Sequence, residues 1–300
     1  MRPANLLFLA GFAAALPKGT SVSKTVNGRA AEVTAADLAN FKYFGEHAAA
    51  TFCNYEASPG ALVKCSSDAC NGLMANGAKI VVTLNHNTST NIAGYIATDD
   101  VRKVIVLAFR GSVTLRNWMA DFNVGFVPCS YGRGGCQIHS GFDKGWSQVR
   151  DQVLPALVAA KKSTGYRIVP GNEYRLTHEN DAVPRLPPLF FGYRHTSTEY
   201  WLNGGDSVSF QYGLQNIKVC QGNANLGCIG SVVGFAPEAH KYYLQLMNGC
   251  RAPGISIRDE TSSAAAGSDV SDEELNRRLE MWAAMDREYL AMLHANGTAA

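Results

Sequence analysis

Cysteine and histidine are numerous enough in this chain to suggest a chemistry of their own. The chain has 300 residues, of which eight are cysteine and seven are histidine. An even number of cysteines favours disulfide bonds and an oxidising compartment, although the sequence alone cannot choose among the many pairings that eight cysteines allow. Zinc binding is the alternative interpretation, but no histidines accompany the cysteines at the spacing of metal ligands. We therefore expect disulfides and no metal site.

A serine nucleophile is the second candidate chemistry, and its usual signature is missing. A serine presented on a strained turn between a strand and a helix is typically found as G-x-S-x-G. This pattern does not occur in the chain. Segment 230–234 (GSVVG) lacks the first glycine at the correct offset, and segment 145–149 (GWSQV) lacks the second. Ser140 lies between His139 and Gly141 with no such turn around it.

Three further polar residues have ordinary structural interpretations when each is taken alone. Asp181 follows Asn180 and fits a turn aspartate. Ser112 comes shortly after an apolar run and fits a helix N-cap. His240, like most single histidines, would be a packing or hydrogen-bonding residue. The same interpretation holds for His139, His178 and His195.

Apolar patterning predicts the elements that must position these residues. The run Lys103–Phe109 is β-branched, apolar and continuous, as expected for a strand that is buried on both faces. Strands alternating with helices indicate an α/β sheet. The other predicted strands are Lys79–Leu84, Gly94–Ala97, Tyr166–Val169 and Glu173–Thr177, and the predicted helices are Ala35–Asn54 and Gly141–Lys161.

Composition and charge exclude two classes of protein. Hydrophobic residues make up 46% of the chain and charged residues 17%, which is enough apolar material for a core. The formal net charge is +2 and no run of Lys or Arg exceeds two residues, which argues against a nucleic-acid-binding face. Outside the N-terminus, no apolar stretch approaches the roughly 20 residues of a transmembrane helix. We therefore expect a globular protein with no nucleic-acid partner and no transmembrane segment.

The two ends of the chain differ from the part between them. An apolar run, Leu6–Leu16, predicts a secretory signal peptide over residues 1–16, with a polar leader over 17–34. After Cys250, residues 251–270 are predicted as a linker. Ser271 with Glu274 forms a capping-box pattern that opens an amphipathic helix over 271–296. We thus expect a secreted, extracellular protein with a helical appendage.

Four stretches in order along the chain carry a resemblance to a known family. They are 106–112 (VLAFRGS), 115–121 (LRNWMAD), 178–188 (HENDAVPRLPP), and 199–201 (EYW) taken with 239–243 (AHKYY). Together they resemble the secreted fungal class 3 lipases, which are α/β-hydrolases related to feruloyl esterases. The resemblance covers residues 35–250 and implies an α/β-hydrolase domain with a central, mostly parallel sheet.

The resemblance assigns roles to individual residues by position. Asp181 matches the family's triad aspartate, which accepts the Nδ1 proton of the catalytic histidine and fixes its tautomer. His240 matches that histidine, the general base. Ser112 matches an oxyanion-hole residue whose backbone N–H meets the developing negative charge. The resemblance implies no cofactor, and the partner that it implies is a lipid ester or a lipid–water interface.

A lid and four disulfides are also implied by the resemblance. Segment 114–122 resembles the helix that covers lipase active sites in water and turns its apolar side to a lipid surface. Its large apolar residues are Leu115, Trp118, Met119 and Phe122. The implied disulfides are Cys53–Cys250, Cys65–Cys70, Cys129–Cys136 and Cys220–Cys228.

The family's nucleophile segment is missing at one place in the chain. In the family, the strand corresponding to Tyr166–Val169 continues into the serine turn, a helix and a further strand, whereas here Val169 runs directly into Pro170. Two strand–helix units, on the order of 60 residues, are therefore expected to be absent, which leaves the central sheet incomplete. We expect this loss to uncover neighbouring apolar surface such as Val104–Leu107.

Local chemistry at this junction conflicts with the family's topology. Residues 169–172 (VPGN) fit a type II turn, which would join Tyr166–Val169 and Glu173–Thr177 as an antiparallel hairpin. The alternative is one bent strand that continues through the junction. In a hairpin, Asp181 and His240 need not face one another.

These observations support a secreted, triacylglycerol lipase-like carboxylic ester hydrolase that is inactive as written, because a serine hydrolase without its nucleophile loses nearly all of its rate. Three alternatives remain: a non-catalytic protein that binds lipid interfaces through segment 114–122, a feruloyl esterase-like ancestry, and residual esterase activity through Ser112 or Ser140 with His240. A gene model or splice form that omits one internal segment would explain the loss.

Overall fold

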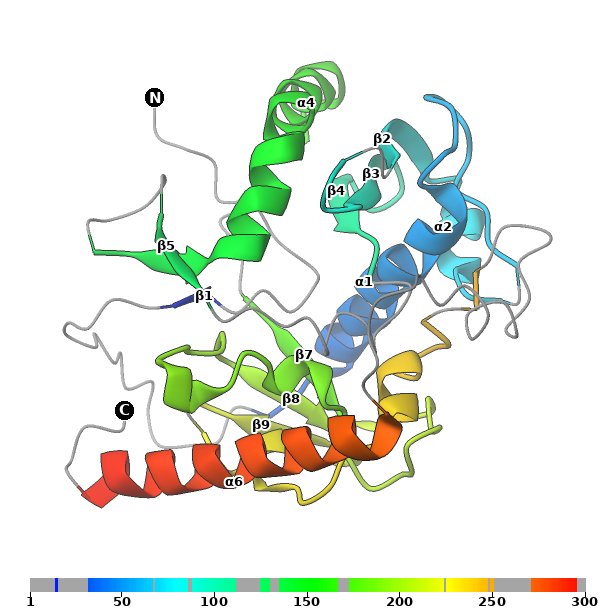
Figure 1. Cartoon of the computed structure of the whole chain (residues 1–300). Helices are drawn as coiled ribbons and strands as arrows, with labels where there is room; N and C mark the ends of the chain where they lie inside the picture. The colour runs from blue at the N-terminus through cyan, green and yellow to red at the C-terminus, as the bar shows by residue number, and fades with distance from the viewer. Residues whose placement is uncertain are drawn as a thin grey trace.

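The strands in the described residues form three separate sheets of three strands each; Figure 1 shows their arrangement. The computed structural model describes residues 14–15, 32–66, 68–85, 88–111, 125–129, 135–166, 173–223, 225–247, 249–250 and 271–295. Within these residues, one sheet has the order β1 (Ala14–Ala15), β6 (Gln137–His139), β5 (Phe126–Pro128). The second has the order β2 (Lys79–Asn85), β3 (Ala93–Asp99), β4 (Val104–Phe109). The third has the order β7 (Arg175–His178), β8 (Glu199–Leu202), β9 (Ile217–Cys220).

The helices lie close to their predicted positions. Helix α1 spans Ala35–Asn54 and begins at Thr34, whose hydroxyl accepts a hydrogen bond from the backbone N–H of Asp37 in a capping box. Helix α4 (Ser140–Thr164) ends at Gly165, which has a left-handed conformation with φ of 70°. The others are α2 (Asn71–Asn76), α6 (Asp272–Ala295) and the 3₁₀ turns η1 (Val183–Arg185), η2 (Leu189–Phe191), η3 (Leu214–Asn216), η4 (Ile229–Ser231) and η5 (Pro237–Lys241).

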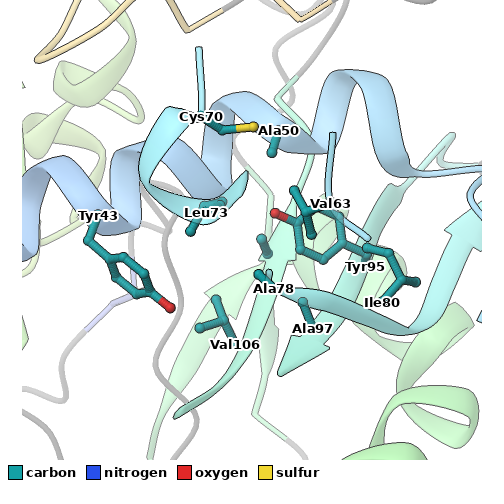
Figure 2. Close-up of a cluster of buried hydrophobic side chains, with 11 residues drawn as sticks. Tyr43, Ala50, Val63, Cys70, Leu73, Ala78, Ile80, Tyr95, Ala97 and Val106 are labelled. Carbon is teal, nitrogen blue, oxygen red and sulfur yellow. The ribbon is translucent and has the colours of Figure 1, made fainter. Parts of the chain in front are cut away.

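The β2–β3–β4 sheet is the middle layer of a three-layer core. Side chains that alternate along the strands point to opposite faces. On one face, Tyr95 and Val106 pack with Tyr43 of α1, as Figure 2 shows. On the other face, Leu107 packs with Val153 of α4. This layer arrangement confirms the predicted α/β class and explains why Lys103–Phe109 reads as continuously apolar.

Two expectations about the sheet need correction. Among the described strand pairs, β7–β8 is parallel and the others are antiparallel, so the sheet is not mostly parallel. The connections between β2, β3 and β4 are only a few residues long, which allows antiparallel neighbours but no parallel crossover. Strand β7 is joined to β8 by residues 179–198, and this connection is long enough for a parallel crossover. Val104–Leu107 is also better covered than expected, because Val106 and Leu107 are 5% and 4% exposed.

The junction between Val169 and Pro170 lies outside the described residues, and so does the hairpin that local turn chemistry predicts there. On the C-terminal side of the junction, β7 pairs in parallel with β8, with Arg175 opposite Glu199 and His178 opposite Leu202. The strand predicted at Glu173–Thr177 is therefore a member of the third sheet. Strand β1 lies inside the range predicted as a signal peptide and pairs with β6.

Four disulfides cross-link the described parts of the chain, and they are the pairs that the resemblance implies. They are Cys53–Cys250, Cys65–Cys70, Cys129–Cys136 and Cys220–Cys228. Cys53–Cys250 closes a loop with a sequence separation of 197 residues, and Cys250 is fully buried with Ala49 of α1. Closing a long loop removes much of the conformational freedom of the unfolded chain. No helix in the described residues combines the length and apolar character of a membrane span.

A buried polar group lies between α1 and the β2–β3–β4 sheet. His47 is fully buried; its Nδ1 lies 2.9 Å from the hydroxyl oxygen of Tyr95 and its Nε2 lies 3.2 Å from that of Tyr43. Tyr43 in turn donates to Asp99 Oδ2 at 3.0 Å. Burial lowers the pKa of His47 to about 3 although the charge of Asp99 opposes this shift. The ring is therefore neutral at physiological pH.

Stability at mildly acidic pH tests this burial. The folded-state pKa of His47 lies below the value of about 6.5 expected in the unfolded chain, so the unfolded state takes up a proton first as the pH falls. We expect the free energy of unfolding to decrease between pH 6.5 and about 3, with this histidine contributing up to ~1.4 kcal/mol per pH unit. Urea unfolding of the unaltered chain and of His47→Gln across this range measures the contribution. An equal pH dependence in the two proteins would contradict a neutral, buried His47.

Candidate active site

Asp181 lies in a buried turn just beyond the end of β7. Its side chain is fully buried, and Oδ1 accepts a hydrogen bond from the backbone N–H of Val183 at 2.9 Å. The backbone N–H of Asp181 donates to the carbonyl of His178 at 2.9 Å. These bonds hold the carboxylate through Oδ1, so Oδ2 is available to donors from elsewhere in the chain.

His240 meets this carboxylate from η5. Its Nδ1 lies 2.9 Å from Asp181 Oδ2, although 59 residues separate the two in sequence. Two further hydrogen bonds join the segments that carry them: the backbone N–H of Ala236 donates to the carbonyl of Asn180 at 3.2 Å, and His178 Nδ1 donates to the carbonyl of Ala239 at 2.8 Å. The structure therefore brings Asp181 and His240 together. The sequence alone left this open, because an antiparallel hairpin at Val169–Pro170 would not have required the two residues to face one another.

Tyr243 is a third member of the site, to which the sequence analysis gave no role. Its hydroxyl donates to the same Asp181 Oδ2 at 2.5 Å. Burial and the negative charge of Asp181 raise the pKa of Tyr243 well above its usual value, so the phenol remains a donor. The signal for it is its position in the AHKYY stretch, three residues after His240.

The electrostatics of the site favour a basic, correctly oriented imidazole. Burial opposes protonation of His240, but the charge of Asp181 and the hydrogen bond to it outweigh burial and hold the pKa of His240 above its usual value. The side chain of His240 is 36% exposed, whereas that of Asp181 is fully buried. A carboxylate on Nδ1 keeps the proton there in the neutral ring and leaves Nε2 as the basic atom. In the described part of the chain, no residue hydrogen-bonds Nε2.

The remaining candidate residues fall into two groups. Ser112 and the predicted lid residues lie outside the described residues: Leu115, Trp118, Met119 and Phe122. The other group, Ser140 and Ser147, lies within them. Ser140 is the first residue of α4, where its backbone N–H donates to the carbonyl of Gly125 at 2.9 Å, and Ser147 Oγ donates to the carbonyl of Lys144 at 2.8 Å. Neither serine is hydrogen-bonded to His240.

The three other histidines that the sequence analysis considered, His139, His178 and His195, lie in structural positions. His178 is fully buried, and its Nε2 lies 2.7 Å from the hydroxyl oxygen of Tyr212. His139 Nδ1 accepts the backbone N–H of Gly141 at 3.0 Å and so caps α4. Burial lowers the pKa of His195 well below its usual value, and its Nε2 has no hydrogen-bond partner. No cluster of His, Cys, Asp or Glu suited to a metal ion occurs among the described residues.

Comparison with known proteins identifies relatives along most of the chain. A family model described as "Lipase (class 3)" matches residues 106–170. A secreted mono- and diacylglycerol lipase 1 of Fusarium solani is 34% identical, with 96% of this chain and 98% of the relative covered. A secreted mono- and diacylglycerol lipase A of Penicillium cyclopium is 30% identical, with 76% and 91% covered. The crystal structure of a mono- and diacylglycerol lipase from Aspergillus oryzae matches with a TM-score of 0.65 and 27% identity, covering 73% of this chain and all of that one.

These matches confirm the predicted α/β-hydrolase fold and carry information about length. The alignment with the Fusarium solani relative runs over 339 positions, 39 more than the 300 residues of this chain, so it contains positions that this chain does not fill. The match to the family model ends at residue 170, next to the junction between Val169 and Pro170.

The pairing of His240 with Asp181 can be tested by titration. Replacing Asp181 with Asn removes the charge that raises the pKa of His240 while the partial burial that lowers it remains. We therefore expect the pKa of His240 to fall in Asp181→Asn, as measured by NMR of the imidazole ring through a pH titration. Glu238→Gln is the matched control, because it removes one negative charge two residues from His240 that is paired instead with Lys241. An equal shift in both variants would contradict a specific pair.

Proposed function

This chain belongs to the class 3 lipase family, and we propose that it keeps the acid and base of a mono- and diacylglycerol lipase-like ester hydrolase but does not itself transfer acyl groups. The observation that carries the proposal is a His240–Asp181 pair whose Nε2 has no hydrogen-bond partner in the described part of the chain, in a sequence without G-x-S-x-G. Relatives named as secreted mono- and diacylglycerol lipases supply the substrate class, glycerol esters of fatty acids.

The retained residues can do a defined part of ester hydrolysis. In a serine esterase, the histidine takes the proton of the serine as its oxygen attacks the ester carbonyl, and then returns it to the leaving alcohol. His240 is prepared for both steps, because Asp181 orients the ring and stabilises its protonated form. Among the described residues no hydroxyl is hydrogen-bonded to Nε2, so the attacking oxygen that the first step requires is missing from this part of the chain. The residues of a triad act as a unit, so losing the nucleophile costs about 10⁶-fold in rate.

Three observations support an excision at Val169–Pro170 as the cause. The family match ends at residue 170, and the alignment with the Fusarium solani relative exceeds this chain in length. In the described part of the chain, β4 pairs with β3 and β7 pairs with β8, and the two sheets are not joined. Strands lost between residues 166 and 173 would have lain between β4 and β7 in chain order. An excision there would account for both the extra length of that alignment and the separation of these two sheets.

The extracellular location is part of the same proposal. The relatives from Fusarium solani and Penicillium cyclopium are named as secreted proteins. The four disulfides and the apolar run Leu6–Leu16 support the same compartment, because disulfides persist in oxidising surroundings.

Hydrolysis assays test the proposed loss of acyl transfer. We expect the purified chain to hydrolyse monoacylglycerols and diacylglycerols no faster than its His240→Ala variant, because no serine oxygen is activated by the imidazole. We also expect no covalent adduct with a fluorophosphonate, a reagent that labels activated serines, as judged by intact-protein mass spectrometry. A fluorophosphonate adduct that requires His240 would contradict the proposal and identify the serine that sequence motifs do not reveal.

A chain with the missing segment restored is the positive control. The segment of the Fusarium solani relative that this chain lacks is inserted between Val169 and Pro170. We expect hydrolysis of monoacylglycerols and diacylglycerols to appear in this chain and to be lost again in its Asp181→Asn and His240→Ala variants. A restored chain that folds but stays inactive would show that the junction is not the site of the loss.

A further inference from the structure

Helix α6 covers both segments that carry the acid–base pair. We call residues 180–186, around Asp181, the acid loop, and residues 235–243, around His240, the base loop. One buried cluster contains Ala182 and Leu186 of the acid loop with Leu275 and Leu279 of α6, and Phe235 of the base loop packs against it. Figure 1 shows the start of α6 beside the turn that contains the base loop. The cluster therefore joins three segments that are far apart in sequence.

The cluster also holds a direct contact between the two loops. The guanidinium carbon of Arg185, in the acid loop, lies 4.5 Å from the centre of the Phe235 ring in the base loop. Trp282 of α6 packs against the same cluster. Leu275 and Leu279 are 4% and 1% exposed, so this side of α6 is buried against the two loops.

The second half of α6 is fastened to the chain that follows the acid loop. Asp286 Oδ1 accepts the backbone N–H of Phe190 in η2 at 2.9 Å. Arg194 donates to the hydroxyl of Tyr289 at 2.9 Å and lies over its ring, with 5.5 Å from the guanidinium carbon to the ring centre. Charge-assisted and cation–π contacts of this kind stabilise a docked helix beyond its apolar burial. The helix is thus anchored along its length on one side of the site.

The two loops have few other means of staying together. Both consist of turns and 3₁₀ segments, without strand pairing to each other. Apart from the His240–Asp181 and Tyr243–Asp181 contacts, the hydrogen bonds between them or across the end of β7 are Ala236 to Asn180 and His178 to Ala239. Each such bond contributes about 1 kcal/mol net. The free energy gained by burying the leucine side chains of α6 is comparable or larger, at roughly 1.5–3 kcal/mol for each fully buried side chain.

We propose that α6 is a clamp that positions Asp181 and His240 against one another, with Leu279 as its principal positioning residue. The helix follows residues 35–250, over which the sequence motifs resemble the family, and it packs on that body from outside. Loosening α6 frees Ala182 and Leu186 on one side and Phe235 on the other, which lets the acid and base loops separate. The inference concerns the geometry of the pair and does not depend on whether the chain hydrolyses esters.

The test compares variants of the full chain by NMR titration of the His240 ring. The groups that face His240 are Asp181, through its hydrogen bond, and Tyr243, whose ring centre lies 6.5 Å away. In Leu279→Ala, we expect the His240 midpoint to move down toward that of a free histidine, because contact with Asp181 is weakened. Met281→Ala is the matched control: it lies on the same helix, is 47% exposed and should leave the midpoint unchanged.

Two further variants separate positioning from general loss of stability. Val153→Ala opens the distant core between α4 and the β2–β3–β4 sheet, so it should lower the melting temperature without moving the His240 midpoint. Asp286→Ala removes the anchor to Phe190 and leaves the apolar side chains of the cluster unaltered. It should move the midpoint in the same direction as Leu279→Ala, and it replaces Leu279→Ala in the test if that variant does not fold. A His240 midpoint that does not move in Leu279→Ala or in Asp286→Ala would overturn the proposed clamp, and so would an equal shift in Val153→Ala.

Discussion

The hydrogen bond between His240 Nδ1 and Asp181 Oδ2 is the interaction on which the account of this site depends. It joins residues from two loops, and it fixes both the direction of the imidazole and the atom that carries its proton. A buried carboxylate needs partners, and Asp181 has three: the backbone N–H of Val183, the ring of His240 and the hydroxyl of Tyr243. The pair is therefore held by the fold itself and does not require a serine beside it.

The remainder of the molecule explains how such a pair is held in a chain whose described strands form separate sheets. The β2–β3–β4 layer is complete in itself, with α1 on one face and α4 on the other, so it does not need further strands to bury its apolar side chains. The β7–β8–β9 sheet has its own cluster with Phe41 of α1, and α6 covers the loops beyond β7. Cys53–Cys250 ties the first helix to the segment that follows the base loop. Each part is supported locally, so the proposed excision is compatible with an acid and base that stay in place.

Sequence reasoning succeeded where the deciding interactions are local. The apolar run Lys103–Phe109 directly predicts a strand, and the helical spacing of residues 35–54 predicts a helix. Strand β4 and helix α1 match these predictions closely. It failed on strand direction, since pairing depends on connections between distant segments. It also expected uncovered surface at Val104–Leu107, of which Val106 and Leu107 are buried and the first two residues are half-buried. Asp181 and His240 were found by their positions in motifs, because nothing in their immediate neighbours indicates that they meet. Tyr243 and Leu279 act through contacts with residues that are distant in sequence, which periodicity alone cannot reveal.

The tautomer of His240 in the unaltered chain is the most direct test of this account. Nitrogen-15 NMR of labelled histidine distinguishes a neutral ring with its proton on Nδ1 from one with its proton on Nε2. Above the pKa of His240, we expect a proton on Nδ1, hydrogen-bonded to Asp181, and an unprotonated Nε2. A neutral ring that carries its proton mainly on Nε2, as free histidine does, would show that Asp181 does not hold this base and would contradict the account.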